Sequence, residues 1–443
     1  MNIAAIVLDT LRKDAFEKHF AWLPGKQFEN AWSPSHWTVP VHGAIFTGLY
    51  PSETGVHSKN VALNCTEEVL AEQLAEAGYT TRAFSCNPYT SPAFEFDRGF
   101  DEFTGSWRLR QLDPDLYDWN SFISETRNEG PTRYLRAVYR CLHDDCRTLP
   151  SLNNGLKMKL REWDFVDSID DDGASEALEY VRDTDFGSEE FLYVNLMEAH
   201  TPYDPPEEYR TVDVAHGGGL EATISEGNDT TVDVGAVRQA YDDCVRYLSD
   251  IYEEIFSVLT DQFDYIITLS DHGELLGEHG GWTHGYGLYR ELTHVPLSIY
   301  GPEIKNGSTN DPVSLLDIHA TVLDLATGEG SPRGHSLLGE DRTEACLTEY
   351  HGLTAQKLNK LRSTDISEQR LNEFDRTLRG IAQSSYYGFK TVDEFVETGE
   401  KPAEDGHADL QEFVDELNVC EQNANQRELS DSVMSQLEEL GYA

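Results

Sequence analysis

The sequence predicts an α/β protein with a mostly parallel central sheet, helices on both faces of it, and a smaller C-terminal α+β subdomain. Short apolar runs bounded by polar residues recur along the chain, which is typical of fully buried strands. Longer stretches between them carry apolar residues at three- and four-residue steps, which is typical of helices. This alternation favours a parallel sheet, because parallel strands need a long crossover connection.

Four segments predict buried strands, at residues 2–8, 191–197, 265–269 and 295–300. Helices are predicted at 67–77, where Thr66 is a good N-cap and Gly78 a good stop, and at 234–260. A further helix is expected to start near Pro40 and to end at Gly48, with Thr38 as its cap.

The length of 443 residues alone suggests either one large α/β unit with an appendage or two to three domains. We place the main unit at 1–335, and we interpret the polar and irregular stretch at about 107–185 as an insertion near the substrate entrance. Residues 336–443 form the expected subdomain, with a strand-like run at 386–392 and an amphipathic helix at 431–440.

The charge is the most unusual feature of the composition: 80 Asp and Glu face 34 Lys and Arg, for a formal net charge of −46. The acidic residues are spread over the whole chain, so we interpret them as an adaptation to a salt-filled cytoplasm, as in extreme halophiles. A basic partner is the weaker interpretation, because the charge is not localised. The negative net charge also disfavours nucleic acids and anionic membranes as partners, because both are negatively charged.

The chain is expected to be cytoplasmic. Its first eight residues lack a basic region and predict a buried strand and not a signal peptide. No apolar run approaches the ~20 residues that a membrane-spanning helix needs. The 7 cysteines are scattered, which does not indicate a disulfide framework.

Acidic residues and histidines follow three of the predicted strands. Asp9 follows the first, His200 comes soon after the second, and Asp271 and His272 follow the third. Ligands of parallel sheets bind beyond the carboxyl ends of the strands, so these side chains are expected at one rim. Each could singly be a cap, a polar turn or an ordinary loop histidine. Together they indicate a divalent ion such as Ca²⁺, Mg²⁺, Mn²⁺ or Zn²⁺.

Thr38 lies at the start of a predicted helix, where free N–H groups and the helix dipole favour a bound oxyanion. From spacing alone, an ordinary threonine cap is the better interpretation.

Several segments resemble the sulfatases of the alkaline phosphatase superfamily, in the order in which that family carries them. They include "NIAAIVLDTLRKD", "WTVPVHGAIFTGLYPSETGV", "EAHTPYDPP", "LSDHGELLGEHGGWTHG", "HVPLSIYGP", "SLLDIHATVLDLA" and "LEELGYA". The likeness extends from residue 2 to the end, with 107–185 and parts of 340–430 poorly covered.

The resemblance implies roles for seven residues. Asp9, Asp271 and His272 would hold the metal, and Thr38 would be both a fourth metal ligand and the nucleophile that the metal activates. His200 and His284 would contact the ester's non-bridging oxygens or the leaving group. His42 lies where the sulfatase motif has its arginine. One ion is favoured over two, although Glu198, His200 and His284 could assemble a second site.

Two departures from true sulfatases favour phosphorus esters. A sulfatase nucleophile is a formylglycine made from Cys or Ser, which Thr38 cannot become, whereas threonine nucleophiles occur among the superfamily's phosphodiesterases, phosphatases and phosphoglycerol or phosphoethanolamine transferases. His284 also replaces a lysine that true sulfatases carry.

The predicted function is therefore a metal-dependent hydrolase of small-molecule phosphate or sulfate esters, with a covalent Thr38 intermediate and a preference for phosphodiesters or phosphomonoesters. The alternatives are a transferase of the phosphoglycerol or phosphoethanolamine type, a true sulfuric ester hydrolase, and a non-catalytic binding protein. The intact set of Asp9, Thr38, Asp271 and His272 argues against the last of these.

We predict that the protein unfolds, or at least loses activity, on dialysis below about 0.5 M salt, because the screening of its −46 net charge then weakens. Circular dichroism across a salt series measures this. Full stability in dilute buffer would contradict a halophilic origin.

Overall fold

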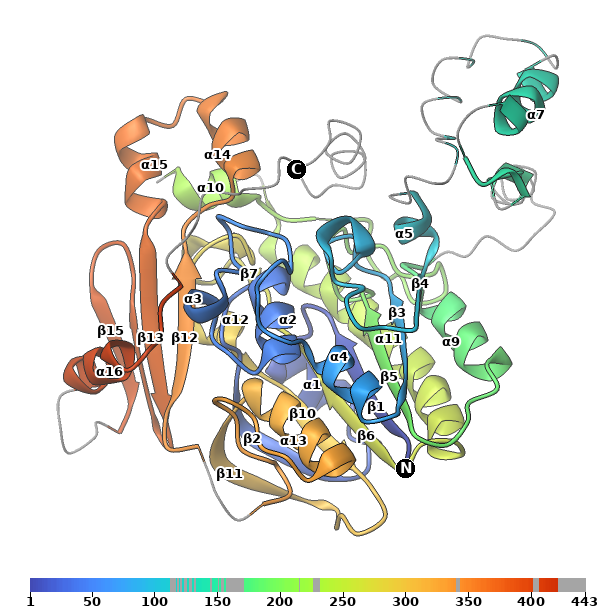
Figure 1. Cartoon of the computed structure of the whole chain (residues 1–443). Helices are drawn as coiled ribbons and strands as arrows, with labels where there is room; N and C mark the ends of the chain where they lie inside the picture. The colour runs from blue at the N-terminus through green and yellow to red at the C-terminus, as the bar shows by residue number, and fades with distance from the viewer. Residues whose placement is uncertain are drawn as a thin grey trace.

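A computed structural model describes residues 1–111, 171–214, 216–225, 232–339, 343–400 and 406–420, together with 133–143 and a few shorter pieces between 112 and 170. Within these residues, a large mixed sheet lies at the centre of the protein and carries helices on both faces (Figure 1). A smaller antiparallel sheet lies beside it. The predicted α/β fold class is confirmed.

The central sheet has the strand order β11-β2-β10-β6-β1-β5-β3-β4, with β9 paired to β2. The five strands from β6 to β4 run parallel to one another, whereas β10 is antiparallel to both of its neighbours. The strands are β1 (Ile3–Leu8), β2 (Lys26–Trp32), β3 (Thr80–Ser85), β4 (Glu102–Gly105), β5 (Glu190–Leu196), β6 (Tyr265–Leu269), β9 (His294–Val295), β10 (Leu297–Tyr300) and β11 (Gly307–Ser314).

The predicted strands agree closely with these bounds. The strand at 265–269 is confirmed as β6, and those at 2–8 and 191–197 correspond to β1 and β5 within one residue at each end. The strand at 295–300 is instead two strands, β9 and β10, that meet at Pro296. Proline has no N–H group to donate to a neighbouring strand, which accounts for the break.

The two faces of β1 belong to two separate cores. Ile3, Ala5 and Val7 face one core, together with α2 (Thr38–Thr47), α4 (Leu70–Glu76) and α13 (Leu316–Thr327). Ala4, Ile6 and Leu8 face the other, with α1 (Lys13–His19), α9 (Ala174–Asp183) and α11 (Val234–Thr260). Each large apolar side chain buried in this way contributes about 1.5–3 kcal/mol, so both faces anchor the central strands.

The helix predictions hold with three corrections. The helix at 234–260 is α11, and Asp233 caps it by accepting a hydrogen bond from Ala236 N at 3.1 Å. The helix at 67–77 begins only at Leu70, because Glu72, and not Thr66, satisfies the first free N–H group, that of Val69. The second correction concerns the role of Thr38 in α2, and the third concerns a regular helix, α9, within the stretch at 107–185.

Thr38 is the first residue of α2 and not its cap, because the extended residue before the helix is Trp37. The helix thus starts two residues before Pro40 and ends, as predicted, at Gly48. The stretch at 107–185 is not irregular throughout: α9 is a regular helix whose Ala177, Leu178 and Val181 are buried in the core.

The smaller sheet has the order β12-β13-β14-β15, all antiparallel. It consists of β12 (Cys346–His351), β13 (Thr377–Gln383), β14 (Tyr386–Lys390) and β15 (Phe395–Gly399), with α14 (Ala355–Arg362), α15 (Glu368–Phe374) and α16 (Gly406–Asp415). The predicted strand at 386–392 is β14. The helix predicted at 431–440 lies outside the described residues, and the 335/336 boundary stays a prediction.

The smaller sheet is joined to the central sheet close to α2. The rings of Trp32 and Tyr387 stack with their centroids 4.3 Å apart. Ser35 pairs with Glu349 of β12, and its hydroxyl donates to the Glu349 carbonyl at 2.7 Å. These contacts fix the loop that leads into Thr38.

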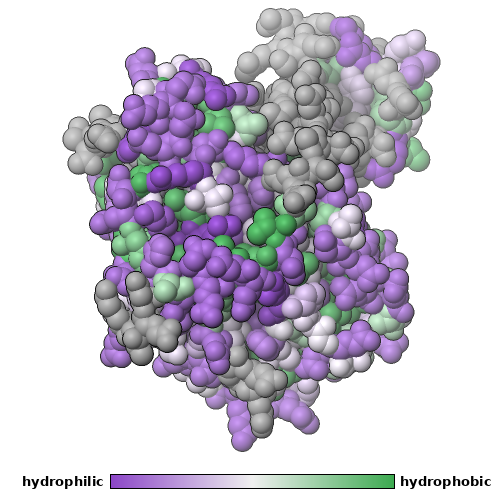
Figure 2. Space-filling model, turned by 60° about the vertical axis from the view of Figure 1, so that its left-hand side comes forward, coloured by the Kyte–Doolittle hydropathy of each residue, from purple (hydrophilic) through white to green (hydrophobic). Residues whose placement is uncertain are grey.

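Shorter elements complete the described chain: α3 (Pro51–Thr54), α5 (Trp107–Gln111), α7 (Arg133–His143), α10 (Leu220–Ile224), α12 (Arg290–Thr293), β7 (Leu275–Leu276), β8 (Trp282–Thr283), and two 3-10 turns at Pro92–Phe94 and Glu278–Gly280. Hydrophilic residues cover most of the face shown in Figure 2. Of the helices described, none has the length and apolar character needed to cross a membrane.

We predict that Gly48→Ala destabilises the protein more than Gly78→Ala. Both glycines are left-handed, with φ of 68° and 93°, which costs an alanine about 1–2 kcal/mol at either position. A Cβ at Gly48 would also lie 2.9 Å from His319 Nδ1, which adds roughly 1–3 kcal/mol, whereas nothing lies within 4 Å at Gly78. Urea unfolding of both variants measures the difference, and equal losses would refute the packing account.

Candidate active site

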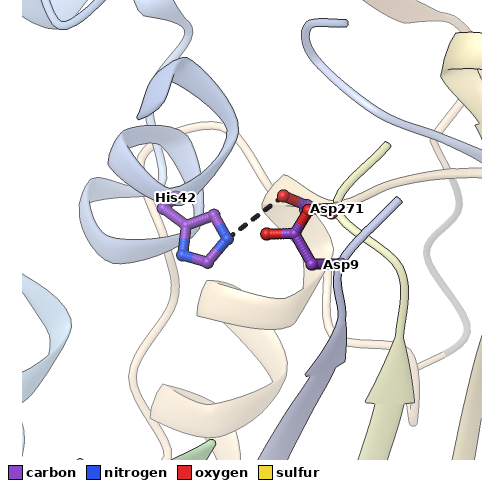
Figure 3. A group of neighbouring side chains, drawn as sticks. All are labelled: Asp9, His42 and Asp271. Carbon is purple, nitrogen blue, oxygen red and sulfur yellow. Dashed lines mark ion pairs between the residues drawn. The ribbon is translucent and has the colours of Figure 1, made fainter. Parts of the chain in front are cut away.

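Two buried carboxylates lie side by side at the carboxyl end of the central sheet. Asp9 follows β1 and Asp271 follows β6, and because these strands are parallel neighbours their ends meet at one place (Figure 3). Both side chains are fully buried. Burial and the charge of Asp271 raise the pKa of Asp9 well above its usual value. The pair therefore requires positive charge nearby if both carboxylates are ionised.

The polar atoms around the pair fit a divalent cation. Among the described residues, no hydrogen bond reaches Asp9 Oδ1 or Asp271 Oδ2. His272 Nε2 lies 3.9 Å from the first oxygen and 3.4 Å from the second. The other ring nitrogen, Nδ1, lies 2.9 Å from the Gly273 carbonyl, to which it can donate. Two carboxylate oxygens and one imidazole nitrogen thus converge, as ligands of one metal ion do.

His42 is the second imidazole at the carboxylate pair. Asp9, His42 and Asp271 each offer a ligand atom, and these atoms all lie within 4.8 Å of one another. His42 Nε2 lies 3.3 Å from Asp271 Oδ2, and its Nδ1 lies 2.7 Å from the hydroxyl of Tyr193. The charges of His272 and His42 outweigh the burial of Asp271 and lower its pKa to about 2. Both histidines therefore favour an ionised Asp271.

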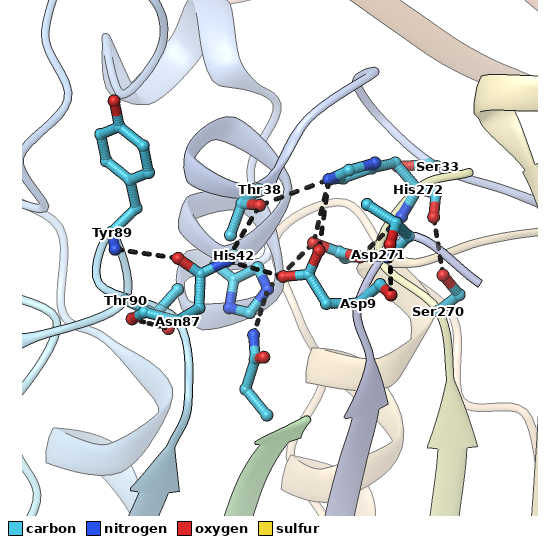
Figure 4. Close-up of polar contacts among 12 residues, drawn as sticks. Asp9, Ser33, Thr38, His42, Asn87, Tyr89, Thr90, Ser270, Asp271 and His272 are labelled. Atoms are coloured by element: carbon cyan, nitrogen blue, oxygen red, sulfur yellow. Dashed lines mark hydrogen bonds and ion pairs between the residues drawn. The ribbon is translucent and has the colours of Figure 1, made fainter. Parts of the chain in front are cut away.

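Thr38 faces the carboxylate pair from the first turn of α2 (Figure 4). Its Oγ1 lies 3.3 Å from His272 Nε2 and 3.3 Å from Asn87 Nδ2. Asn87 also donates to Asp9 Oδ2 at 2.7 Å, so one amide connects the hydroxyl with the carboxylate. Such a buried hydroxyl, beside an imidazole and at a helix N-terminus, can act as a nucleophile.

His284 packs against His272, and His200 packs against His284. The ring centroids of His284 and His272 are 4.6 Å apart, and those of His284 and His200 are 5.1 Å apart. Burial lowers the pKa of His200 to about 3 and places that of His284 well below its usual value. His284 Nδ1 lies 3.1 Å from Glu274 Oε1, and burial raises the pKa of Glu274 to about 7.

A cavity of about 920 Å³ adjoins the loop that carries His200. It is lined by residues of this loop, of α5 and of the segment before α9, among them Arg108, Asp171, Asp172, Pro202, Asp204 and Arg210. Arg108 pairs with Asp172, and Arg210 pairs with Asp204. The cavity is therefore polar and mostly acidic.

The structure brings together Asp9, Thr38, His42, Asp271 and His272, and it places His284 and His200 next to them. The second metal site that Glu198, His200 and His284 could have formed does not appear among the described residues. Glu198 faces α9 instead, where its Oε1 accepts a hydrogen bond from Ala174 N at 2.7 Å.

Three further residues of the site were not predicted from the sequence. Asn87 follows β3, whose polar residues kept the strand from being recognised in the sequence. Had β3 been predicted, the position of Asn87 after the end of a parallel strand would have marked it as a candidate. Asn195 lies in β5, and its Nδ2 is 3.3 Å from His42 Nε2. Thr10 has a φ of 58° and donates its backbone N–H to Asp271 Oδ1 at 3.3 Å. A single sequence carries no signal for the last two.

Comparisons with known proteins show the family to which this chain belongs. The family model described as "Sulfatase" matches residues 18–329. A choline-sulfatase of Rhizobium meliloti (strain 1021) is 36% identical over 361 residues, which cover 73% of this chain and 67% of the relative. The uncharacterized sulfatase YidJ of Escherichia coli (strain K12) is 23% identical over 351 residues, covering 74% and 66%. The chain belongs to the sulfatase family, and it spans about two thirds of the length of these relatives.

Solved structures show the same fold. The phosphonate monoester hydrolase SpPMH from Silicibacter pomeroyi has a TM-score of 0.59 at 18% identity, with 94% of each chain covered. A phosphonate monoester hydrolase of Agrobacterium radiobacter has a TM-score of 0.58 at 18% identity, with 90% of this chain and 89% of the other covered.

We predict that Asp271→Ala and His272→Ala each lose more than about 100-fold in affinity for a divalent ion, because each would remove a predicted ligand of the ion. Calorimetric titration of Mg²⁺, Ca²⁺ and Mn²⁺ into chelator-treated protein measures this. His42→Gln should lose only about 10–100-fold, as expected for a residue that orients a ligand. The exposed His279→Ala is the control and should bind like the wild type. If His42→Gln abolished binding and His272→Ala did not, His42 would be the imidazole ligand.

Proposed function

We propose that the protein is a metal-dependent hydrolase of small-molecule phosphate or sulfate esters, with Thr38 as its nucleophile. The observation that carries this proposal is the position of Thr38 Oγ1, 3.3 Å from His272 Nε2 and beside the two buried carboxylates. Membership of the sulfatase family supports ester hydrolysis. The acidic composition supports a salt-filled cytoplasm as the place where it works.

Asp9, Asp271 and His272 would hold one divalent ion, with Thr38 Oγ1 at its edge. When bound, this ion supplies positive charge that favours the deprotonated hydroxyl and offsets charge on the ester's oxygens. His42 supports Asp271 from the other side, and Asn87 orients both Asp9 and the Thr38 hydroxyl.

Thr38 attacks the phosphorus or sulfur atom in line with the departing alcohol. The new bond forms from Thr38 Oγ1 as the bond to the alcohol oxygen breaks, and water then releases the phospho- or sulfo-threonine. His200 and His284 contact the non-bridging oxygens or the leaving group. The alcohol part can extend into the polar cavity beside the His200 loop.

We propose that phosphorus esters are the preferred substrates. Threonine cannot become the aldehyde that gives sulfatases an elimination route for releasing covalent sulfate, so a sulfo-threonine must be hydrolysed directly. Sulfuric ester hydrolysis is the second candidate, since a choline-sulfatase is 36% identical over 361 residues. Transfer of the intermediate to an alcohol acceptor is a third candidate, and an acceptor-dependent product would reveal it.

We predict that Thr38→Ala loses several orders of magnitude in kcat/KM, because the attacking oxygen is gone, whereas Thr38→Ser retains measurable activity. Thr47→Ala is a matched control on the same helix. Its hydroxyl donates to the Gly43 carbonyl at 2.7 Å, so its loss should reduce stability and leave turnover intact. A Thr38→Ala variant with wild-type activity would refute the proposed nucleophile.

We also predict that phosphodiester turnover exceeds sulfate turnover in the wild type. A panel of nitrophenyl phosphate, phosphodiester and sulfate esters, assayed in high salt with different divalent ions, measures this. A clear sulfate preference would show that the missing aldehyde matters less than the overall likeness to sulfatases.

A further inference from the structure

A lysine from the C-terminal region lies close to the residue that precedes Thr38. Lys357 lies on α14, whose first turn is capped by the Thr354 hydroxyl. Its ammonium group lies 5.6 Å from the centre of the Trp37 ring. Trp37 is the residue immediately before Thr38, so the charge of Lys357 lies next to the start of the nucleophile helix.

The charge of Lys357 reaches the histidines around Thr38. After burial, it is the first cause that lowers the pKa of His36, and it also lowers that of His284. Burial lowers the pKa of Lys357 to about 8, and the charge of Glu274, the partner of His284, opposes this shift. The ammonium group is therefore close enough to His36, His284 and Glu274 for their charges to interact.

Lys357 differs from the two arginines whose charge also reaches the site. Arg12 is committed to the carboxylates of Asp14 and Glu278. Arg108 is committed to Asp172. Among the residues that the structure describes, Lys357 Nζ has neither a hydrogen bond nor an ion pair, and its side chain is half-buried. In a chain with 80 acidic residues against 34 basic ones, such a cation is unusual.

We propose that Lys357 is a substrate-binding residue that contacts an outer oxygen of the sulfuryl or phosphoryl group held in front of Thr38. The ammonium group is a donor that pairs with no carboxylate among the described residues. It interacts with His36 and His284, whose pKa values burial lowers. A charge-assisted hydrogen bond to an anionic oxygen is among the stronger contacts available to it. This inference rests on the proposed ester hydrolysis, and it gives the C-terminal region a part in the site.

Binding of an inorganic anion tests the inference without turnover. Sulfate and phosphate are titrated into the Mg²⁺-loaded wild type and into Lys357→Met, Lys357→Gln and Lys357→Arg by calorimetry. The two neutral variants should bind both anions at least about tenfold more weakly, and Lys357→Arg should stay within about threefold of the wild type. Lys360→Met, an exposed lysine on the same helix, is the matched control and should bind like the wild type.

A purely structural role gives a different pattern. If Lys357 only covered Trp37, the neutral variants would unfold at a lower temperature but bind anions like the wild type, which would overturn the inference. The inference would also be overturned if the wild type bound neither anion. It would likewise be overturned if the neutral variants lost affinity only for esters with a second anionic group in the alcohol part.

The pH dependence of sulfate binding supplies a test that needs no variant. Sulfate does not titrate in this range, so its affinity for the wild type should fall as the pH passes about 8 and Lys357 loses its proton. A constant affinity from pH 7 to 9 would contradict the inference. A protein that binds sulfate through Lys357 but cleaves no ester would refute the proposed function alone.

Discussion

The site depends on two carboxylates that the fold buries side by side. Asp9 and Asp271 are fully buried at the ends of adjacent parallel strands, and each keeps one oxygen without a hydrogen bond from the described residues. Two such charges repel strongly in a medium of low dielectric, and the imidazoles of His42 and His272 offset this only in part. A divalent cation is the group that best resolves the conflict. The energetic cost of burying the pair is therefore the physical reason to expect a metal ion at this place.

The rest of the fold places a hydroxyl and its supports around this pair. The α2 helix brings Thr38 to the carboxylates from one face of the sheet, and Asn87 at the end of β3 fixes its orientation. The smaller sheet holds the loop before α2 through Ser35 and Glu349. The C-terminal region thus helps to position Thr38, the proposed nucleophile, and also carries Lys357.

Much of this arrangement could be predicted from the sequence, because buried parallel strands are short, strongly apolar and followed by the functional residues. The runs that became β1, β5 and β6 identified Asp9, His200, Asp271 and His272 in this way. Thr38 depended on the resemblance, since a threonine at a helix start is usually structural. Asn87 and Lys357 escaped prediction for physical reasons: β3 is too polar to stand out, and Lys357 reaches the site through tertiary packing alone.

The most direct test of the account is the thermal unfolding of the wild type and of Asp9→Asn, each with excess Mg²⁺ and with a chelator, in high salt. A ligand that binds only the folded state stabilises it, by about 2.7 kcal/mol at a hundred times its dissociation constant. The chelator should therefore lower the Tm of the wild type clearly and leave that of Asp9→Asn unchanged. In the chelator, Asp9→Asn should be at least as stable as the wild type, because one of two repelling charges is gone. A wild-type Tm that is the same with metal and with chelator would contradict the account.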